Sequence, residues 1–337
     1  MTKYQVKTGG KLYLAGEYAI LTPGQQALLQ FIPISLTAEI EPASSYQLYS
    51  DMFAYKVGLE RDKNYSLIQE TIAVVEDYLK TRGIKPRPFS LSITGKLEKD
   101  GKKFGLGSSG SVTVLVVKAL AALYQEDWSA DFIFRLASYT LLKRGDNGSM
   151  GDLACIAYED LVLFKAFDRA RVRTWIKSDS LSQVLARDWG YQIESVRPAL
   201  DFDFLVGWTG LPSISRDMID QVKSAISADF LEPTQVAVEA TAQGLRTGDK
   251  ELVKVSLQKV SDLLKNLHPA IYTEELLVLE GAVQGLDAVA KSSGSGGGDC
   301  GIALSFNEQS TETLKNRWAD LGIELLYQER IGHDDKS

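Results

Sequence analysis

The central stretch "FGLGSSGS", residues 104–111, has residue types suited to holding an anion. It sets three glycines and three serines before an apolar run from Val112 to Tyr124. Glycines let backbone N–H groups approach a bulky anion, because no Cβ stands in the way. The apolar run predicts a buried helix whose N-terminus directs free N–H groups and its positive dipole end at the loop. Phosphate is the natural ligand, and a capped helix behind a flexible loop is the alternative.

The stretch departs from two well-known nucleotide motifs. A Walker A loop needs glycine, four residues and then Gly-Lys-Ser/Thr, which is absent here. Gly105, Gly107 and Gly110 match the spacing of a dinucleotide fingerprint, but no strand–turn–helix unit with a later acid is evident. Neither motif therefore accounts for the loop.

Three other stretches could supply chemistry beside a phosphate. "KTGGKLYLAGEYAIL" places Lys11 after a glycine pair, and "KRGDNGSMGDLA" places Asp152 in a second glycine-rich loop. "KSSGSGGGDCGIAL" is a third glycine-rich stretch. Isolated Gly/Ser runs are usually linkers, but here buried-looking sequence resumes at Cys300 without a spacer. A lysine, a carboxylate and a further loop thus accompany the central motif.

The pattern of strands and helices predicts an α+β protein without a regular βαβ rhythm. Residues 5–21 are expected to form a strand, a glycine turn and a second strand, and residues 272–291 a helix. A buried strand in "DFDFLVGWTG" suggests that a second unit begins nearby. We expect an N-terminal domain at 1–195 and a C-terminal domain at 196–337.

Composition narrows the function classes for these 337 residues. A net charge of −7 disfavours generic nucleic-acid binding. There is no apolar run of transmembrane length and no secretory pattern at the N-terminus, so we expect no membrane segment. Two distant cysteines and two histidines argue for a cytoplasmic protein with reduced thiols, and against a zinc site or a histidine triad.

Three motifs, the N-terminal "GGKLYLAGEYAIL", the central "GLGSSGS" and the C-terminal "GSGGGDCGIAL", together resemble the GHMP kinase family of small-molecule kinases. They occur in the family's order and span nearly the whole chain. The resemblance implies an N-terminal half similar to ribosomal protein S5 and a ferredoxin-like C-terminal half, with the active site between them. The first and third motifs are most similar to bacterial members that use ATP and Mg²⁺ to convert (R)-5-phosphomevalonate to 5-diphosphomevalonate, a step of isoprenoid biosynthesis. Mevalonate kinases more often carry histidine where this chain has Tyr18.

The resemblance also implies roles for individual residues. Lys11 and Asp152 would be catalytic, and Ser109, with Ser108 as the alternative, would contact Mg²⁺. The family's nucleotide loop maps onto Gly105, Leu106, Gly107, Ser108, Ser109, Gly110 and Ser111. Substrate contacts map onto Lys11, Tyr18, Lys103, Ser149, Ser215, Ser293, Gly294, Ser295 and Gly296.

One family feature is missing. Many members carry a metal-binding glutamate shortly before the loop acid, and "YTLLKRGDNG" has none. Asp146 could substitute, or phosphates, Ser109 and water could hold the ion, because Mg²⁺ keeps several waters.

The chemistry of a phosphate acceptor favours cations over a base. A phosphomonoester has a second pKa of about 6, so it arrives largely dianionic at neutral pH. Repulsion between two phosphates then becomes the main obstacle, and cations should carry much of the work. We expect Lys11 and the pair Lys102–Lys103 to do this, and prefer Lys103 because it lies nearer the loop. A solvated charge pair is the alternative for those two lysines.

Other interpretations stay open at this stage. The chain could be another GHMP kinase, for mevalonate or homoserine, or a catalytically inactive relative that senses metabolites. Tyr18 could be a core aromatic, Ser215 a helix cap, and Asp299 an anchor for the third loop through backbone N–H groups. A monomer or a homodimer is expected.

Overall fold

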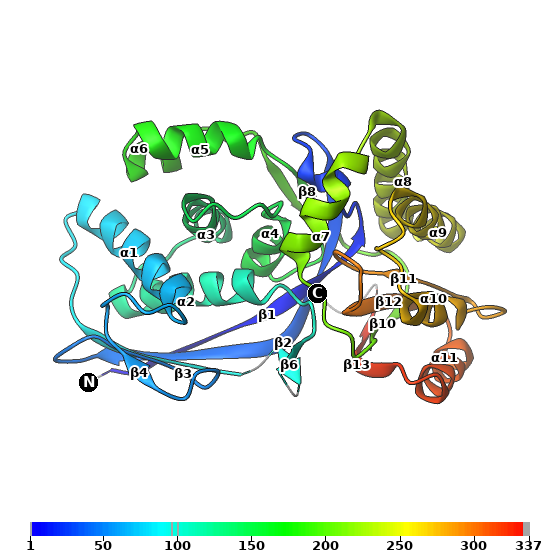
Figure 1. Cartoon of the computed structure of the whole chain (residues 1–337), viewed down its shortest axis with the longest axis horizontal. Coiled ribbons are helices and arrows are strands. Elements are labelled where there is room, and N and C mark those ends of the chain that lie inside the picture. The colour runs from blue at the N-terminus through cyan, green and yellow to red at the C-terminus, as the bar shows by residue number, and fades with distance from the viewer. Residues whose placement is uncertain (1, 96, 100, 333–337) are drawn as a thin grey trace.

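The computed structural model describes residues 2–95, 97–99 and 101–332. Two main sheets carry helices packed around them (Figure 1), which confirms the expected α+β class. The described part of the chain contains no helix with the length and apolar character that crossing a membrane requires.

The larger sheet is built around one long strand. β2 pairs with β1, β5 and β8, always antiparallel, and so forms the spine of seven strands. The strands are β1 (Tyr4–Ala15), β2 (Gln26–Pro42), β3 (Gln47–Ser50), β4 (Lys56–Val57), β5 (Phe89–Thr94), β8 (Val162–Lys165) and β9 (Gln192–Ser195).

Helices α1 to α4 lie on one face of this sheet, and α5 and α6 lie beyond them (Figure 1). α2 is apolar nearly all round and is buried between the sheet and its neighbouring helices. The helices are α1 (Ser66–Thr81), α2 (Ser108–Tyr124), α3 (Ala130–Lys143), α4 (Gly151–Tyr158), α5 (Arg169–Ser178) and α6 (Leu181–Ala186). A small hairpin, β6 (Glu98–Lys99) and β7 (Lys102–Lys103), leads into the loop before α2.

The smaller sheet is antiparallel, in the order β11-β12-β10-β13. Every residue of β10 is buried, as its largely apolar sequence predicts, and Asp203 is the one charged residue in it. Its strands are β10 (Phe202–Trp208), β11 (Ala288–Ser292), β12 (Cys300–Ser305) and β13 (Glu324–Ile331). Its helices are α7 (Ser215–Val222), α8 (Ala228–Thr247), α9 (Lys250–Leu267), α10 (Glu274–Gly281) and α11 (Glu308–Asp320), and the short 3₁₀ turn η2 (Lys223–Ala225) follows α7. The chain passes between the two sheets after Ser195, and the domain boundary there stays a prediction.

The first glycine motif differs from its expected strand–turn–strand form. β1 runs unbroken through Gly9 and Gly10, with a register shift beside them. A Cβ at Gly9 would lie 2.1 Å from the Ile32 carbonyl oxygen, and one at Gly10 would lie 2.7 Å from the Leu106 carbonyl oxygen. The pair therefore permits close packing within a strand. The chain turns later, into the short 3₁₀ helix η1 (Ala19–Leu21).

The helix expected at 272–291 is also divided. α10 ends at Gly281, and the chain continues as β11 from Ala288. The segment "AVAKS" is buried and pairs along its length with β12. The segment runs on from a helical pattern and is buried throughout, so its periodicity alone could not indicate a strand.

A buried ion pair joins the two sheets. Glu17, just after β1, is 2% exposed, and Lys291 of β11 is 1% exposed. Their Oε1 and Nζ atoms lie 2.5 Å apart, and Lys291 also donates to the Ser292 carbonyl. Breaking a buried pair leaves an uncompensated charge inside the protein. The register of the first motif against β11 is therefore strongly held.

We predict that Lys291→Met lowers the free energy of unfolding by about 3–5 kcal/mol, because Glu17 loses its partner. The double variant Glu17→Gln/Lys291→Met should regain most of this loss, since no charge is then stranded. Denaturant unfolding of the wild type and both variants measures the effect. A loss below about 1 kcal/mol for Lys291→Met would show the pair to be solvated.

Candidate active site

The glycine loop expected to bind phosphate, residues 105–111, is seated at the N-terminus of α2 and is called the phosphate loop below. Gly107 precedes the helix with φ 82°, and Ser108 is its first residue. The backbone N–H of Lys11 donates to the Leu106 carbonyl at 3.0 Å, which fixes the loop against β1. The Ser111 hydroxyl donates to the Gly107 carbonyl at 3.1 Å. The N–H groups of the first helical turn have no partner within the helix, so they can bind an anion.

Lys11 and Asp152 meet at this loop. A Cβ on Gly107 would lie 3.1 Å from Cε of Lys11 and 3.7 Å from Cβ of Asp152. A Cβ on Gly110 would lie 2.6 Å from Oδ2 of Asp152. Three segments far apart in sequence thus converge, and glycine is what lets the two side chains lie against the helix start.

The surroundings of the two charges are largely apolar. Lys11 is 7% exposed, and its Nζ lies 5.1 Å from the centre of the Tyr13 ring. Burial raises the pKa of Asp152, while the positive charge of Lys11 acts in the opposite direction. Lys11 is therefore the nearby cation that stabilises the ionised carboxylate.

Ser149 connects the second glycine loop to β1. Its hydroxyl lies 2.9 Å from the Tyr13 hydroxyl and accepts the backbone N–H of Gly151 at 3.1 Å. The pKa of Tyr13 is raised, chiefly by burial. The phenol therefore stays protonated and can donate a hydrogen bond. Ser149 lies three residues before Asp152, so this contact fixes the entry to α4.

The third glycine loop closes over the first motif. The Ser293 hydroxyl donates to the Tyr13 carbonyl at 2.9 Å, and the Tyr18 hydroxyl donates to the Ser295 carbonyl at 2.5 Å. Tyr18 is buried, and its hydrogen bond to Ser295 anchors the third loop to the first motif. Gly294 has φ 85° with open space around it.

Ser215 lies at the start of α7, opposite the third loop. Its hydroxyl is 3.2 Å from that of Ser295, while Ile214 occupies the N-cap position of α7. At Gly296 a Cβ would lie 2.3 Å from the Ile271 carbonyl oxygen, so this glycine is required by packing.

Asp299 organises the end of the third loop. Its Oδ1 accepts the backbone N–H of Ser213 at 2.9 Å, and its own N–H donates to the Leu211 carbonyl at 2.6 Å. A Cβ on Gly105 would lie 2.5 Å from Oδ2 of Asp299. The anchor therefore joins the segment before α7 to the phosphate loop.

Of the two lysines before the phosphate loop, the structure describes the side chain of Lys102 and only the backbone of Lys103. The Lys102 Nζ donates to the Gly210 carbonyl at 3.0 Å, so it bridges β7 to the segment after β10. The backbone of Lys103 lies in β7, but its side chain lies outside the described part of the structure. Its preference over Lys102 as a substrate contact stays a prediction.

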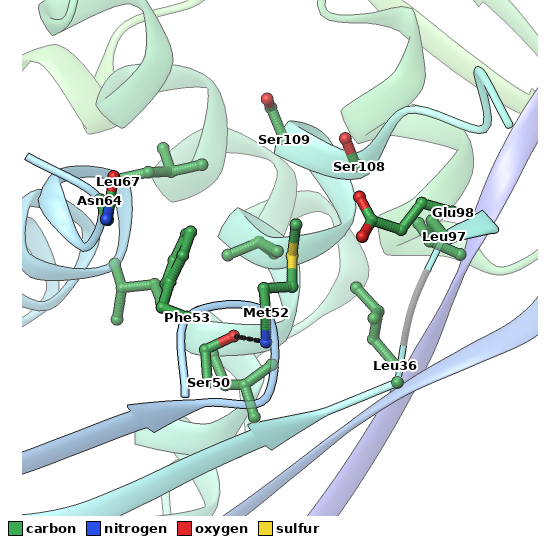
Figure 2. Close-up of a pocket in the computed structure, with 14 residues that line it drawn as sticks. Leu36, Ser50, Met52, Phe53, Asn64, Leu67, Leu97, Glu98, Ser108 and Ser109 are labelled. Atoms are coloured by element: carbon green, nitrogen blue, oxygen red, sulfur yellow. Dashed lines mark hydrogen bonds between the residues drawn. The ribbon is translucent and has the colours of Figure 1, made fainter. Parts of the chain in front are cut away.

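Sequence reasoning missed an apolar cavity of about 140 Å³ beside the phosphate loop. Figure 2 shows Ser108, Ser109 and the Glu98 carboxylate on one side of it, and Met52 and Phe53 on another. Its lining comes from many separate elements, including β2, β3, α1 and β5. No single stretch of sequence carries such a signal.

With this geometry in view, known proteins can be compared. A family model for the GHMP kinase N-terminal domain matches residues 66–160. The phosphomevalonate kinase of Streptomyces sp. (strain CL190) is 30% identical, and the match covers 93% of each chain. The chain belongs to the GHMP kinase family.

Solved structures of GHMP kinases agree with this assignment. The Streptococcus pneumoniae phosphomevalonate kinase in complex with phosphomevalonate and AMPPNP is 58% identical, with a TM-score of 0.96 over 97% of this chain and 100% of that one. The Methanococcus jannaschii mevalonate kinase, at 19% identity and TM-score 0.74 over 97% of this chain and 98% of that one, shares the fold. The expected GHMP kinase fold is thereby confirmed.

The missing family glutamate has no obvious replacement. Asp146 accepts the N–H of Gly148 at 2.7 Å, so its Oδ1 closes the loop on itself. Within the described ranges, no three or more His, Cys, Asp or Glu side chains cluster in a way that could hold a metal ion. Any Mg²⁺ in this GHMP kinase would need nucleotide phosphates and water among its ligands.

We predict that Gly110→Ala lowers kcat on the order of 10- to 100-fold, because the new methyl group displaces the Asp152 carboxylate. The melting temperature should change little, since alanine favours a helix. Gly281→Ala is the matched control: it is also helical, and a Cβ there would meet nothing within 4 Å. Steady-state kinetics with both variants would refute the idea if Gly110→Ala stayed fully active.

Asp152→Asn should stabilise the ligand-free protein at neutral pH. The folded-state pKa of Asp152 is raised, so stability falls as the pH rises above the unfolded-state pKa, and the full penalty is present above the folded-state pKa. The amide removes this penalty, and the gain should disappear below about pH 4, where the unfolded chain is protonated as well. Thermal unfolding of both proteins at neutral and acidic pH measures the difference. An asparagine variant that is less stable at neutral pH would mean that Lys11 outweighs burial.

Proposed function

We propose that this chain transfers the γ-phosphate of ATP to (R)-5-phosphomevalonate, giving 5-diphosphomevalonate and ADP in the mevalonate pathway. The observation that carries the proposal is the convergence of Lys11, Asp152 and the N-terminus of α2. It occurs in a chain closely similar to an enzyme solved with phosphomevalonate and AMPPNP. The acceptor is a phosphate group, so the reaction is a phosphotransfer between two phosphates.

The nucleotide occupies the start of α2. Backbone N–H groups of residues 105–111 cradle the triphosphate, and the positive end of the helix dipole opposes its charge. The adjoining apolar cavity takes the base, because it borders Ser108 and Ser109 and is lined by flat and flexible apolar side chains such as Phe53 and Met52. The hydroxyl of Ser109 and the carboxylate of Asp152 are oxygen ligands that suit Mg²⁺. Held there, Mg²⁺ would neutralise phosphate charge.

The acceptor lies between the second and third glycine loops. Ser149 and Lys11 face it from the larger sheet, and Ser215, Ser293 and Ser295 from the smaller one. Gly294 leaves open space on the same side. These hydroxyls and backbone groups can bind the polar groups of a small hydroxy acid without a large pocket.

The chemical step needs little base catalysis. An oxygen of the acceptor phosphate attacks the γ-phosphorus, and the bond to the β–γ bridging oxygen breaks as ADP leaves. That acceptor oxygen is already ionised at neutral pH. Lys11 offsets the charge that accumulates on the transferred group, and Asp152 keeps Lys11 in place and would help to hold the metal.

Both cysteines fit a reducing compartment. Cys155 and Cys300 are buried free thiols, and Cys300 donates to the Phe104 carbonyl at 3.0 Å. Burial raises the pKa of each thiol well above its ordinary value, so neither is reactive. We place the enzyme in the cytoplasm on this ground.

An assay of ADP release, run with phosphomevalonate and with mevalonate as separate acceptors, tests the proposal. We expect turnover with phosphomevalonate and at most weak turnover with mevalonate. Equal or greater turnover with mevalonate would overturn the substrate assignment. Absence of turnover with both would favour a metabolite-binding role.

We predict that Lys11→Met lowers kcat by about 10²–10³-fold, as the loss of one transition-state electrostatic group does. Asp152→Asn should have a smaller effect, because the acceptor arrives ionised and needs no base. Steady-state kinetics at saturating substrate measure both. If Asp152→Asn abolished activity while Lys11→Met was mild, the electrostatic account would be wrong.

A further inference from the structure

The loop that leads to Asp152 is held from outside by arginine side chains. Residues 145–150 join α3 to α4 and contain Ser149. Four consecutive carbonyl groups of this loop accept hydrogen bonds from three arginines. Arg169 donates to Asn147 at 3.1 Å and to Gly148, Arg173 donates to Asp146, and Arg216 donates to Gly145 at 3.4 Å.

Arg169 reaches a second segment of the site. Its other terminal nitrogen donates to the Leu21 carbonyl at 2.6 Å. Leu21 ends η1, which begins immediately after Tyr18. One guanidinium therefore ties the first motif, with Glu17 and Tyr18, to the loop that carries Ser149 and precedes Asp152.

The position of Arg169 on α5 accounts for these contacts. It is the first residue of the helix, after the N-cap Asp168, and Arg173 lies one turn later on the same face. Both side chains are partly buried. Burial and the neighbouring charge of Arg173 lower the pKa of Arg169, an unfavourable setting that the carbonyl contacts offset.

Arginine suits this task better than lysine. Its planar group presents five N–H donors in a fixed fork, whereas lysine directs three donors from one point. The fork lets one side chain hold three carbonyls on two chain segments. The carbonyl oxygens of residues 146–148 thus face α5, while the Ser149 hydroxyl reaches Tyr13 on β1.

We propose that Arg169 is a positioning residue for the kinase reaction, with Arg173 in support. It fixes the loop so that Ser149 and Asp152 lie correctly against Lys11 and the start of α2. The inference rests on the proposed role of Asp152. The hydrogen bonds of Arg169 go to carbonyls outside the phosphate loop, so its loss should leave nucleotide binding intact.

The test compares Arg169→Lys, Arg169→Met and Arg173→Met with the wild type. We expect Arg169→Lys to lower kcat on the order of 10- to 100-fold, with the KM for ATP within about twofold, since displacement of a catalytic group by an ångström has that effect. Arg169→Met should show a similar loss of kcat, because the charge that the lysine variant keeps is not sufficient without the fork. Arg173→Met, which loses one carbonyl contact, should have a smaller effect.

Arg171→Met is the matched control. Arg171 lies on the same helix and is exposed, and its guanidinium carbon lies 4.8 Å from the centre of the Trp175 ring, a contact within α5 itself. The kcat of this variant should match the wild type. Rates are measured well below each melting temperature and per folded enzyme, so that loss of fold is not counted as loss of catalysis.

Several outcomes would overturn the proposal. Normal kcat per folded enzyme in Arg169→Lys would do so, as would equal losses in kcat and ATP affinity. If the Arg169 variants do not fold, normal kcat in Arg173→Met would count against it and a selective fall in kcat would support it. Asp152→Asn is assayed in parallel: full activity there would refute the role of Asp152 itself, whereas a loss there beside a normal Arg169→Lys would refute the positioning role alone.

Discussion

The buried pair of Glu17 and Lys291 is the contact on which the rest of the site depends. Lys11, Ser149 and Asp152 belong to one sheet and its helices, whereas Ser293 and Ser295 follow a strand of the other. A buried ion pair adds little net stability, but it is costly to break. The pair therefore fixes the position of the first motif against β11. With this position fixed, Tyr18 and Ser293 can make their hydrogen bonds between the two sheets.

Residue type and order could predict the parts of the site that lie within single motifs. The phosphate loop, the helix behind it, Lys11 and Asp152 all belong to short stretches whose glycines and charges fit few alternative structures. Features that depend on pairing with another strand could not be predicted this way. β1 passes straight through Gly9 and Gly10 because β2 and Leu106 pack on it, and β11 is a strand because β12 lies beside it.

The apolar cavity beside the phosphate loop and the arginine contacts escaped prediction for a related reason. Cavity residues such as Phe53 and Leu97 are ordinary apolar positions whose common surface exists only after folding. Arg169 and Arg173 lie in a helix rich in arginine, a composition typical of a solvated face. Their partners are backbone carbonyls, which every residue has, so the sequence does not indicate which ones are bound. Side chains that recognise main chain are thus the least visible part of an active site.

The contact from Lys102 to the Gly210 carbonyl joins the β6–β7 hairpin to the segment after β10. Unlike the Glu17–Lys291 pair, it is exposed, and it can open without stranding a charge in the interior. It lies at the surface, while buried contacts of Phe104 with Trp208 and Cys300 lie just behind it. Loss of this contact would therefore remove one tie of the hairpin and leave the buried ion pair between the two sheets in place.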